Sequence, residues 1–221
     1  MSIATQLASV QGTIPEGVEL IAVSKTHPVE AIREAYDAGH RAFGENRVQE
    51  FLEKVGDLPK DVQWHLIGHL QRNKVKMVVG RVALIHSVDS PRLLEAIDRE
   101  AQAKGVCQDI LLQAHVAQEQ TKFGFAPQEL KEYLQSFSSE EHPGIRIRGL
   151  MGMATFTFDE QQVRTEFRQL KQLFDWLTGT GLLPTDQRSY LSMGMSGDYH
   201  LAIDEGSTMV RVGSAIFGTR Q

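Results

Sequence analysis

Short apolar runs alternate with longer amphipathic segments along this chain, and this alternation is the feature that most narrows the folds open to it. Such runs are typical of buried parallel strands, and the longer segments are typical of the helices that cover them. We expect strands at residues 19–24, 42–44, 64–67, 82–88, 109–116, 146–153, 190–193 and 209–212. We expect helices between them at 29–38, 46–55, 70–79, 90–103, 127–137, 159–177 and 197–203, with 215–217 in a terminal segment.

Eight strands alternating with helices in 221 residues match a minimal (β/α)8 TIM barrel. No stretch rich in proline, glycine and serine interrupts the chain, and its composition does not shift along its length. The prediction is therefore one α/β domain over residues 1–221. A doubly wound open sheet would produce the same alternation, so periodicity alone leaves that architecture open.

Composition and charge exclude several classes of protein. The formal charge of −5, with scattered basic residues, argues against a nucleic-acid surface. The single Cys107 excludes an internal disulfide and a cysteine-rich metal site, and we expect it to be a buried thiol. Residues 1–12 lack the features of a signal peptide, and no apolar run reaches membrane-spanning length. We therefore expect a cytoplasmic protein that binds neither nucleic acid nor membrane.

Lys25 closes the first predicted strand and is followed at once by Thr26, His27 and Pro28. The carboxyl ends of parallel strands are where barrels keep their active sites. A lysine among apolar neighbours there loses hydration, so we expect its pKa to fall and its neutral amine to become available to a carbonyl group. A lysine that only lays its stem over apolar surface would give the same local sequence, so this motif alone does not decide.

Further polar residues follow the other predicted strands, and in a barrel these strand ends converge on one mouth. A purely structural core does not account for so many polar groups at one topological position. They are Glu45, Asn46 and Arg47 after the second strand, His65 and His69 around the third, Ser87 and Asp89 at the fourth, and Ser192, Ser196, Arg211 and Ser214 at the last two.

Two of these segments have the composition of a phosphate-binding cup. Residues 192–198 supply hydroxyl groups and glycine-flanked N–H groups before a short predicted helix, and Gly213 and Ser214 offer a second such turn. Helix N-termini attract anions, and the loops after strands seven and eight are the common phosphate site of such barrels. Each turn alone is more often only a turn.

Arg211 lies on the last predicted strand beside this cup. It could be a charged partner for Asp204 or Glu205. Alternatively, a guanidinium that faces a pyridine nitrogen would keep that nitrogen unprotonated, which weakens the ring as an electron sink. A lysine, a phosphate cup and an arginine at one barrel mouth together suggest pyridoxal 5′-phosphate (PLP) as the cofactor.

At this point the chain also resembles the family of pyridoxal phosphate homeostasis proteins, which are similar to the barrel domain of alanine racemase standing alone, without its C-terminal β domain. The resemblance covers essentially the whole chain. It rests on seven ordered motifs: residues 22–25 (AVSK), 43–50 (FGENRVQE), 64–74 (WHLIGHLQRNK), 86–89 (HSVD), 149–153 (GLMGM), 191–198 (LSMGMSGD) and 210–218 (VRVGSAIFG).

The resemblance implies roles for individual residues. Lys25 would carry PLP as an internal aldimine, and Arg211 would face the pyridine nitrogen. The phosphate would be held by Ser196, Gly197, Gly213 and Ser214, and the ring would be lined by Asn46, His65, Ser87 and Met193. The family usually has a Gln-Val-Asn pattern on strand five, whereas this chain has Gln113, Ala114 and His115; the lysine-x-glycine that follows is matched by Lys122 and Gly124.

A second proton-transferring group distinguishes an enzyme from a carrier. Racemisation needs one base on each face of the substrate, and in alanine racemase the second base is a tyrosine of the further domain. None of the four tyrosines here (Tyr36, Tyr133, Tyr190 and Tyr199) has a motif that marks it as that base. The interpretation is therefore a monomeric protein that carries, buffers or delivers PLP and so affects amino-acid and keto-acid balance. Apo-enzymes that use PLP, or a regulatory protein, are the partners expected for it. A racemase or other PLP-dependent enzyme is the alternative.

Three further hypotheses remain from the residues. A metal site could use His65, His69 and His86, although no carboxylate motif lies near them. Helical apolar stripes at residues 130–137 and 167–177 could form a docking face, although such stripes usually pack on the barrel. A phosphosugar lyase could use Lys25 to form a Schiff base with an aldehyde or ketone substrate.

Overall fold

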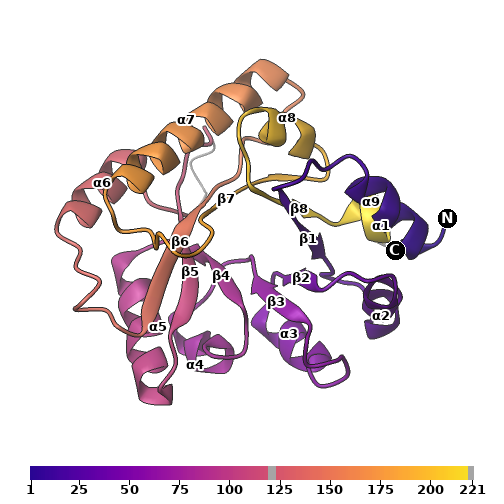
Figure 1. Cartoon of the computed structure of the whole chain (residues 1–221), viewed down its shortest axis with the longest axis horizontal. Helices are drawn as coiled ribbons and strands as arrows, with labels where there is room; N and C mark the ends of the chain where they lie inside the picture. Colours follow the sequence, from indigo (N-terminus) through magenta and orange to yellow (C-terminus); the bar gives the residue numbers. More distant parts are fainter. Residues whose placement is uncertain (119–122, 219–221) are drawn as a thin grey trace.

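A computed structural model of the chain, which describes residues 1–118 and 123–218, is a closed barrel of eight parallel strands surrounded by helices (Figure 1). Each strand pairs with the next in sequence, and the last pairs with the first, so the open-sheet alternative is wrong. All predicted strands are present, with ends that differ by at most three residues. They are β1 Glu19–Val23, β2 Ala42–Glu45, β3 Gln63–Leu66, β4 Leu84–Val88, β5 Gln108–Gln113, β6 Ile145–Met151, β7 Tyr190–Met195 and β8 Met209–Val212.

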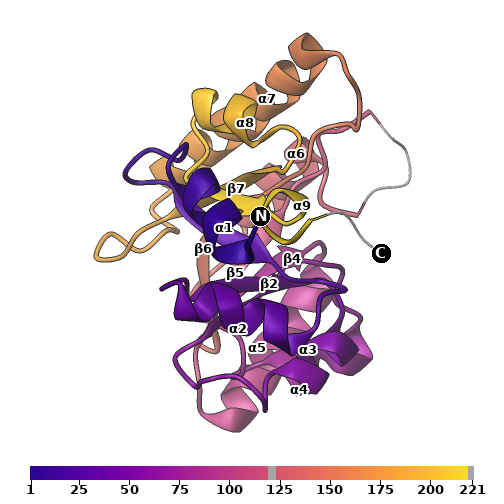
Figure 2. The ribbon, with the colours of Figure 1, turned by 90° about the vertical axis from the view of Figure 1, so that its right-hand side faces the viewer.

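The helices cover the outside of the barrel, and Figure 2 shows α2 and α3 on one side with α7 and α8 on the other. They are α1 Ile3–Gln11, α2 Val29–Asp37, α3 Val48–Lys54, a 3-10 turn η1 Arg72–Lys74, α4 Val75–Val78, α5 Pro91–Lys104, α6 Pro127–Gln135, α7 Glu160–Gly179, α8 Tyr199–Asp204 and α9 Ser214–Phe217.

Two helical segments differ from the predictions. Helix α1 was not predicted; the Ser2 hydroxyl caps it by accepting a hydrogen bond from the N–H of Thr5, and its apolar side is buried through Leu7 and Val10. The single helix expected at 70–79 is replaced by η1 and the four-residue α4. β-Branched valines at the end of this segment have low helix propensity, which favours the shorter elements.

The apolar side chains form two layers. A small cluster inside the barrel comes from six strands, and a larger one fills the space between strands and helices. Alternation along β1 illustrates this, because Ile21 belongs to the inner cluster while Leu20 and Ala22 belong to the outer one. Both predicted helical stripes, on α6 and α7, lie in the outer cluster, so they pack on the barrel.

Gly149 marks a place in the sheet where no side chain fits. Its φ is +138°, and a Cβ there would lie 1.9 Å from the carbonyl oxygen of Tyr190 on β7. We expect Gly149→Ala to force β6 and β7 apart and to lower the free energy of unfolding by about 3 kcal/mol or more, as measured by urea denaturation. The matched control is Gly179→Ala at the end of α7, where a Cβ meets nothing within 4 Å. A Gly149→Ala variant as stable as that control would contradict the steric argument.

Cys107 is exposed, and the prediction of a buried thiol is wrong. It lies in the short turn between Gly105, which ends α5 in a left-handed conformation, and β5. Cys107 belongs to neither of the two apolar clusters. Among the helices of the described residues, none combines the length and apolar character required to cross a membrane.

Candidate functional site

A cavity of about 770 Å³ lies at the carboxyl ends of the barrel strands, and it gathers most of the residues singled out from the sequence. It also takes in Val23, Gly68, His69, Gln113 and Asp198, together with the apolar side chains of its mouth. Of the ten residues predicted to bind the cofactor, seven line it: Lys25, Asn46, Ser196, Gly197, Arg211, Gly213 and Ser214.

The other three predicted residues are not among those that line the cavity. His65 and Met193 are buried in the barrel. Ser87 is also buried, and its hydroxyl donates a hydrogen bond of 2.6 Å to the carbonyl oxygen of Gly68, which does line the cavity. Contact between these three side chains and the ring of a cofactor stays a prediction.

The two glycine-serine loops after β7 and β8 are joined to each other. Ser196 Oγ accepts a hydrogen bond of 3.0 Å from the N–H of Gly213, and Asp198 accepts one from the N–H of Met195. Gly213 also packs closely on β1, because a Cβ there would lie 3.1 Å from the carbonyl oxygen of Val23. One hydroxyl-bearing rim therefore runs from the end of β7 across β8 to the strand that precedes Lys25.

Arg211 is buried beneath this rim, with only 3% of its surface exposed. Its guanidinium donates to the carbonyl oxygen of Ser192 at 2.8 Å, to the hydroxyl of Ser192 at 2.6 Å and to the carbonyl oxygen of Gly152 at 3.0 Å. Burial lowers the pKa of Arg211 to about 10, while Asp198 opposes the shift, so the group remains a cation at neutral pH. Asp204 and Glu205 pair instead with arginines of α7, so the surface ion-pair alternative for Arg211 is wrong.

A chain of hydrogen bonds continues from Arg211 into the barrel. The Ser192 hydroxyl lies 3.1 Å from Nδ1 of His86, and Nε2 of His86 lies 3.0 Å from Nδ1 of His65. Because Ser192 Oγ accepts from Arg211, its proton satisfies His86 Nδ1, and His86 Nε2–H then donates to His65. From the sequence, Ser192 was singled out only as a strand-end hydroxyl and His86 only as a candidate metal ligand. No local signal paired them with each other or with Arg211.

His65 and His86, the two histidines of this hydrogen-bonded series, are neutral in the folded protein. Burial lowers the pKa of His65 to about 3, with a smaller contribution from the charge of His40. Burial also lowers the pKa of His86 well below its ordinary value, and His65 and Arg211 add to the effect. The larger cause for both groups is that a protonated imidazole inside the barrel loses its hydration. At His86, a protonated ring would also be repelled by the Arg211 cation in a medium that screens charge poorly.

His69 lies at the mouth of the cavity and is not part of the hydrogen-bonded series that joins Arg211 to His65. Its Nδ1 lies 3.0 Å from Asp89 Oδ2, and its ring stacks on Phe123 with ring centroids 4.0 Å apart. The three histidines proposed as a metal site are thus split between two different networks. Among residues 1–118 and 123–218, no group of three His, Cys, Asp or Glu side chains could hold a metal ion.

Strand β5 contributes its last residue, Gln113, to the lining of the cavity, and the Gln113 amide donates to the carbonyl oxygen of Phe123 at 3.0 Å. His115, in contrast, is not among the lining residues. Lys122, part of the lysine-x-glycine match, lies outside the described residues. The mouth is also rimmed by exposed aromatic side chains, of which Phe156 and Phe158 are almost fully exposed.

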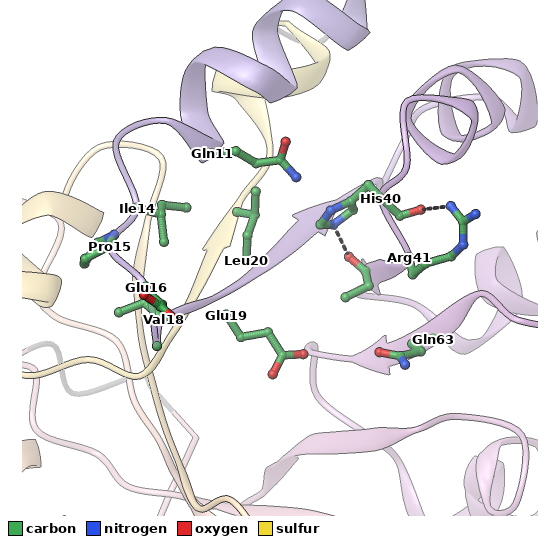
Figure 3. Close-up of a pocket in the computed structure, with 12 residues that line it drawn as sticks. Gln11, Ile14, Pro15, Glu16, Val18, Glu19, Leu20, His40, Arg41 and Gln63 are labelled. Carbon is green, nitrogen blue, oxygen red and sulfur yellow. Dashed lines mark hydrogen bonds between the residues drawn. The ribbon is translucent and has the colours of Figure 1, made fainter.

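A second cavity of about 430 Å³ lies at the opposite, amino-terminal ends of β1 to β3 (Figure 3). Glu19, His40, Arg41 and Gln63 line it, but none of the residues predicted to bind the cofactor does. His40 donates to the carbonyl oxygen of Ala42 at 2.8 Å, and Arg41 donates to the carbonyl oxygen of His40 at 2.9 Å. Since the predicted cofactor-binding residues line the other cavity, the cavity that contains Lys25 is the candidate site.

The residues around Lys25 fit the chemistry of PLP. Lys25 supplies an amine for an aldehyde, Arg211 a buried cation, and Ser196 and Ser214 hydroxyl groups for a phosphate. Gly197 leaves space at the rim, because a Cβ there would meet nothing within 4 Å.

Comparisons with known proteins agree with this site. The family model described as the alanine racemase N-terminal domain matches residues 1–221. The pyridoxal phosphate homeostasis protein of Aquifex aeolicus is 42% identical over 210 residues, which cover 92% of this chain and 87% of that protein. The one from Vibrio alginolyticus is 38% identical over 214 residues, which cover 95% and 89%.

Solved structures give the same result. PipY of Synechococcus elongatus with PLP bound has a TM-score of 0.87 and 41% identity, and the match covers 98% of this chain and 100% of that one. Alanine racemase of Clostridium difficile shares the fold with a TM-score of 0.80 at 15% identity, over 97% of this chain and 55% of the racemase. The chain therefore belongs to the alanine racemase N-terminal domain family and, within it, to the pyridoxal phosphate homeostasis proteins.

Proposed function

We propose that this protein binds PLP and serves its homeostasis as a carrier, buffer or donor of the cofactor. The observation that carries the proposal is a single cavity in which Lys25, the buried cation Arg211 and the two hydroxyl-bearing loops meet. The relatives named pyridoxal phosphate homeostasis proteins, and the PLP-bound structure of PipY, support the same ligand.

The proposal assigns a role to each part of the cavity. Lys25 Nζ forms the covalent bond to the cofactor, and Arg211 faces its pyridine nitrogen. Ser196, Gly197, Gly213 and Ser214 hold its phosphate, and Asn46 lies against its ring; His65, Ser87 and Met193 complete the ring's surroundings. When bound, PLP supplies an aldehyde carbon and a ring that withdraws electrons from an attached amine. Arg211 keeps the ring nitrogen unprotonated, because a guanidinium does not give up a proton at neutral pH.

A binding role is favoured over racemisation by the positions of the tyrosines. The hydroxyl of Tyr36 donates a hydrogen bond to the carboxylate of Asp61, and the hydroxyl of Tyr199 lies 2.9 Å from that of Thr13. Both tyrosines lie on the outside of the barrel. None of the four tyrosines is among the described residues that line the cavity. We extend the proposal to a cytoplasmic monomer that passes PLP to apo-enzymes or meets a regulatory protein.

The test is an absorbance spectrum of the purified full chain before and after borohydride, beside Lys25→Ala. We expect a yellow band in the wild-type protein that borohydride removes, and no such band in the variant, because Lys25 is the one lysine among the described residues that line the cavity. A wild-type protein that stays colourless with added PLP would overturn the proposal. So would a Lys25→Ala variant that keeps the band.

A further inference from the structure

A buried group of charges lies directly behind Lys25, between the barrel and α3. Glu45 ends β2 and is 1% exposed, and Lys54 at the end of α3 is 6% exposed. Lys54 Nζ lies 2.8 Å from Glu45 Oε1 and 2.7 Å from Glu50 Oε1, so one ammonium group bridges two carboxylates. Neither the predicted phosphate cup nor the predicted ring contacts involve these three residues.

The group binds the residues on both sides of Lys25. The Ser24 hydroxyl donates to Glu45 Oε1 at 2.6 Å, and Lys54 donates to the carbonyl oxygen of Ser24 at 2.9 Å. The N–H of Thr26 donates to Glu50 Oε1. The Ser24 side chain therefore points to Glu45 behind the barrel, while Lys25 lines the cavity.

The backbone at Thr26 is held in an unfavourable conformation. Its φ of +67° makes it the only residue other than glycine with a positive φ in the described part of the chain. A β-branched residue rarely adopts this region, and such strain persists only where the surroundings impose it. Two hydrogen bonds hold it here: the N–H of His27 donates to the carbonyl oxygen of Ser24 at 3.1 Å and closes the turn, and the N–H of Thr26 donates to Glu50.

Stability alone does not explain why these charges are buried. Burial raises the pKa of Glu45, and Glu45 Oε2 has no hydrogen-bond partner among the described residues. A buried ion pair of this kind is often no more stable than well-packed apolar residues of the same size. A strained turn held by a costly ion pair is typical of a site that must be positioned.

We propose that Glu45, Glu50 and Lys54 are positioning residues that fix the turn around Lys25 and so present its amine to a carbonyl group in the cavity. The inference rests on the proposed attachment of PLP to Lys25. None of the three touches the cavity, so their effect on the ligand passes through Ser24 and Thr26.

The experiment compares Glu50→Ala with Glu53→Ala, an exposed glutamate on the same helix. The full chain without bound cofactor is titrated with PLP, and with pyridoxine 5′-phosphate, which has the same ring and phosphate but no aldehyde. We expect Glu50→Ala to form the PLP band about ten times more slowly or with about tenfold weaker affinity. Its affinity for pyridoxine 5′-phosphate should equal that of the wild type, and Glu53→Ala should match the wild type with both ligands.

Glu50→Gln provides the conservative variant. Its amide oxygen still accepts the hydrogen bond from Thr26, so it should restore most of the rate lost in Glu50→Ala and should fold even if the alanine variant does not. Equal losses with both ligands would mean a structural role only, and no loss with PLP would mean no role; either result overturns the inference. The wild-type and Lys25→Ala spectra decide separately whether PLP attaches to Lys25 at all.

Discussion

Lys54→Met is expected to lower the free energy of unfolding at pH 7 by about 3–5 kcal/mol, because it removes one partner of a buried ion pair. The carboxylate of Glu45, 1% exposed, would lose its ammonium partner, and the carbonyl oxygen of Ser24 would lose a donor. Urea denaturation followed by circular dichroism measures the loss. The methionine has a similar length and no charge, so packing is conserved as far as the site allows.

A double variant separates charge from packing. Glu45→Leu together with Lys54→Met removes both ends of the most deeply buried pair, and we expect it to recover most of the loss. The carboxylate then left without the ammonium is that of Glu50, whose side chain is 18% exposed and keeps part of its hydration. The single variant should also regain stability as the pH falls. Burial already raises the pKa of Glu45, and without Lys54 the folded state takes up the proton more readily than the unfolded chain. A Lys54→Met variant as stable as the wild type would contradict this account of the pair.

The second large effect is the dependence of stability on pH below neutrality. His65, with a folded-state pKa of about 3, and His86, with a pKa well below its ordinary value, stay neutral where the unfolded chain takes up protons. Their contribution to stability is fully present above the unfolded pKa of about 6.5 and is lost as the pH falls below it; for His65 the loss continues toward pH 3. At about 1.4 kcal/mol per pH unit, protonation of His65 should cost about 2 kcal/mol between pH 7 and pH 5, and His86 should add to the loss in the same direction.

Urea denaturation at pH 7, 6 and 5 measures this slope. Burial raises the pKa of Glu19 and Glu45, which adds stability as the pH falls, so the histidine contribution has to be isolated by variants. His65→Gln should show a shallower slope than the wild type, while His200→Gln, on the surface of α8, should keep the wild-type slope. Equal slopes in all three proteins would contradict the assignment of the effect to the buried pair.

The fold could be predicted because its information is local. Each strand is a short apolar run beside an amphipathic helix, and a chain of this length has few ways to bury eight of them. Helix α1 was missed because its start depends on a single cap, Ser2, before a stripe as short as Leu7 and Val10. The helix expected at 70–79 was too long because the β-branched valines at its end have low helix propensity, and a turn and a short helix form there instead.

The cavity was predicted in outline because strand ends converge in a barrel, which brought Lys25, Asn46 and Arg211 together. What could not be predicted is the layer behind it. Lys54 looks like an ordinary surface lysine, and the packing of α3 on β2 buries it against Glu45. The pairing of Ser192 with His86 joins residues 106 positions apart in sequence, and no local pattern reports such a contact.

Closure of the barrel joins the two strands that matter most for the site. β1, which leads into Lys25, pairs directly with β8, where Arg211 lies opposite Ile21. A small molecule held by both residues therefore bridges the seam between the first and last strands. By thermodynamic linkage, such a ligand at 100 times its dissociation constant resists opening of that seam by about 2.7 kcal/mol. Ligand binding at the site and opening of the barrel between β1 and β8 are then linked equilibria. The rate of amide hydrogen exchange along β1 and β8 should therefore fall as the fraction of protein with bound cofactor rises.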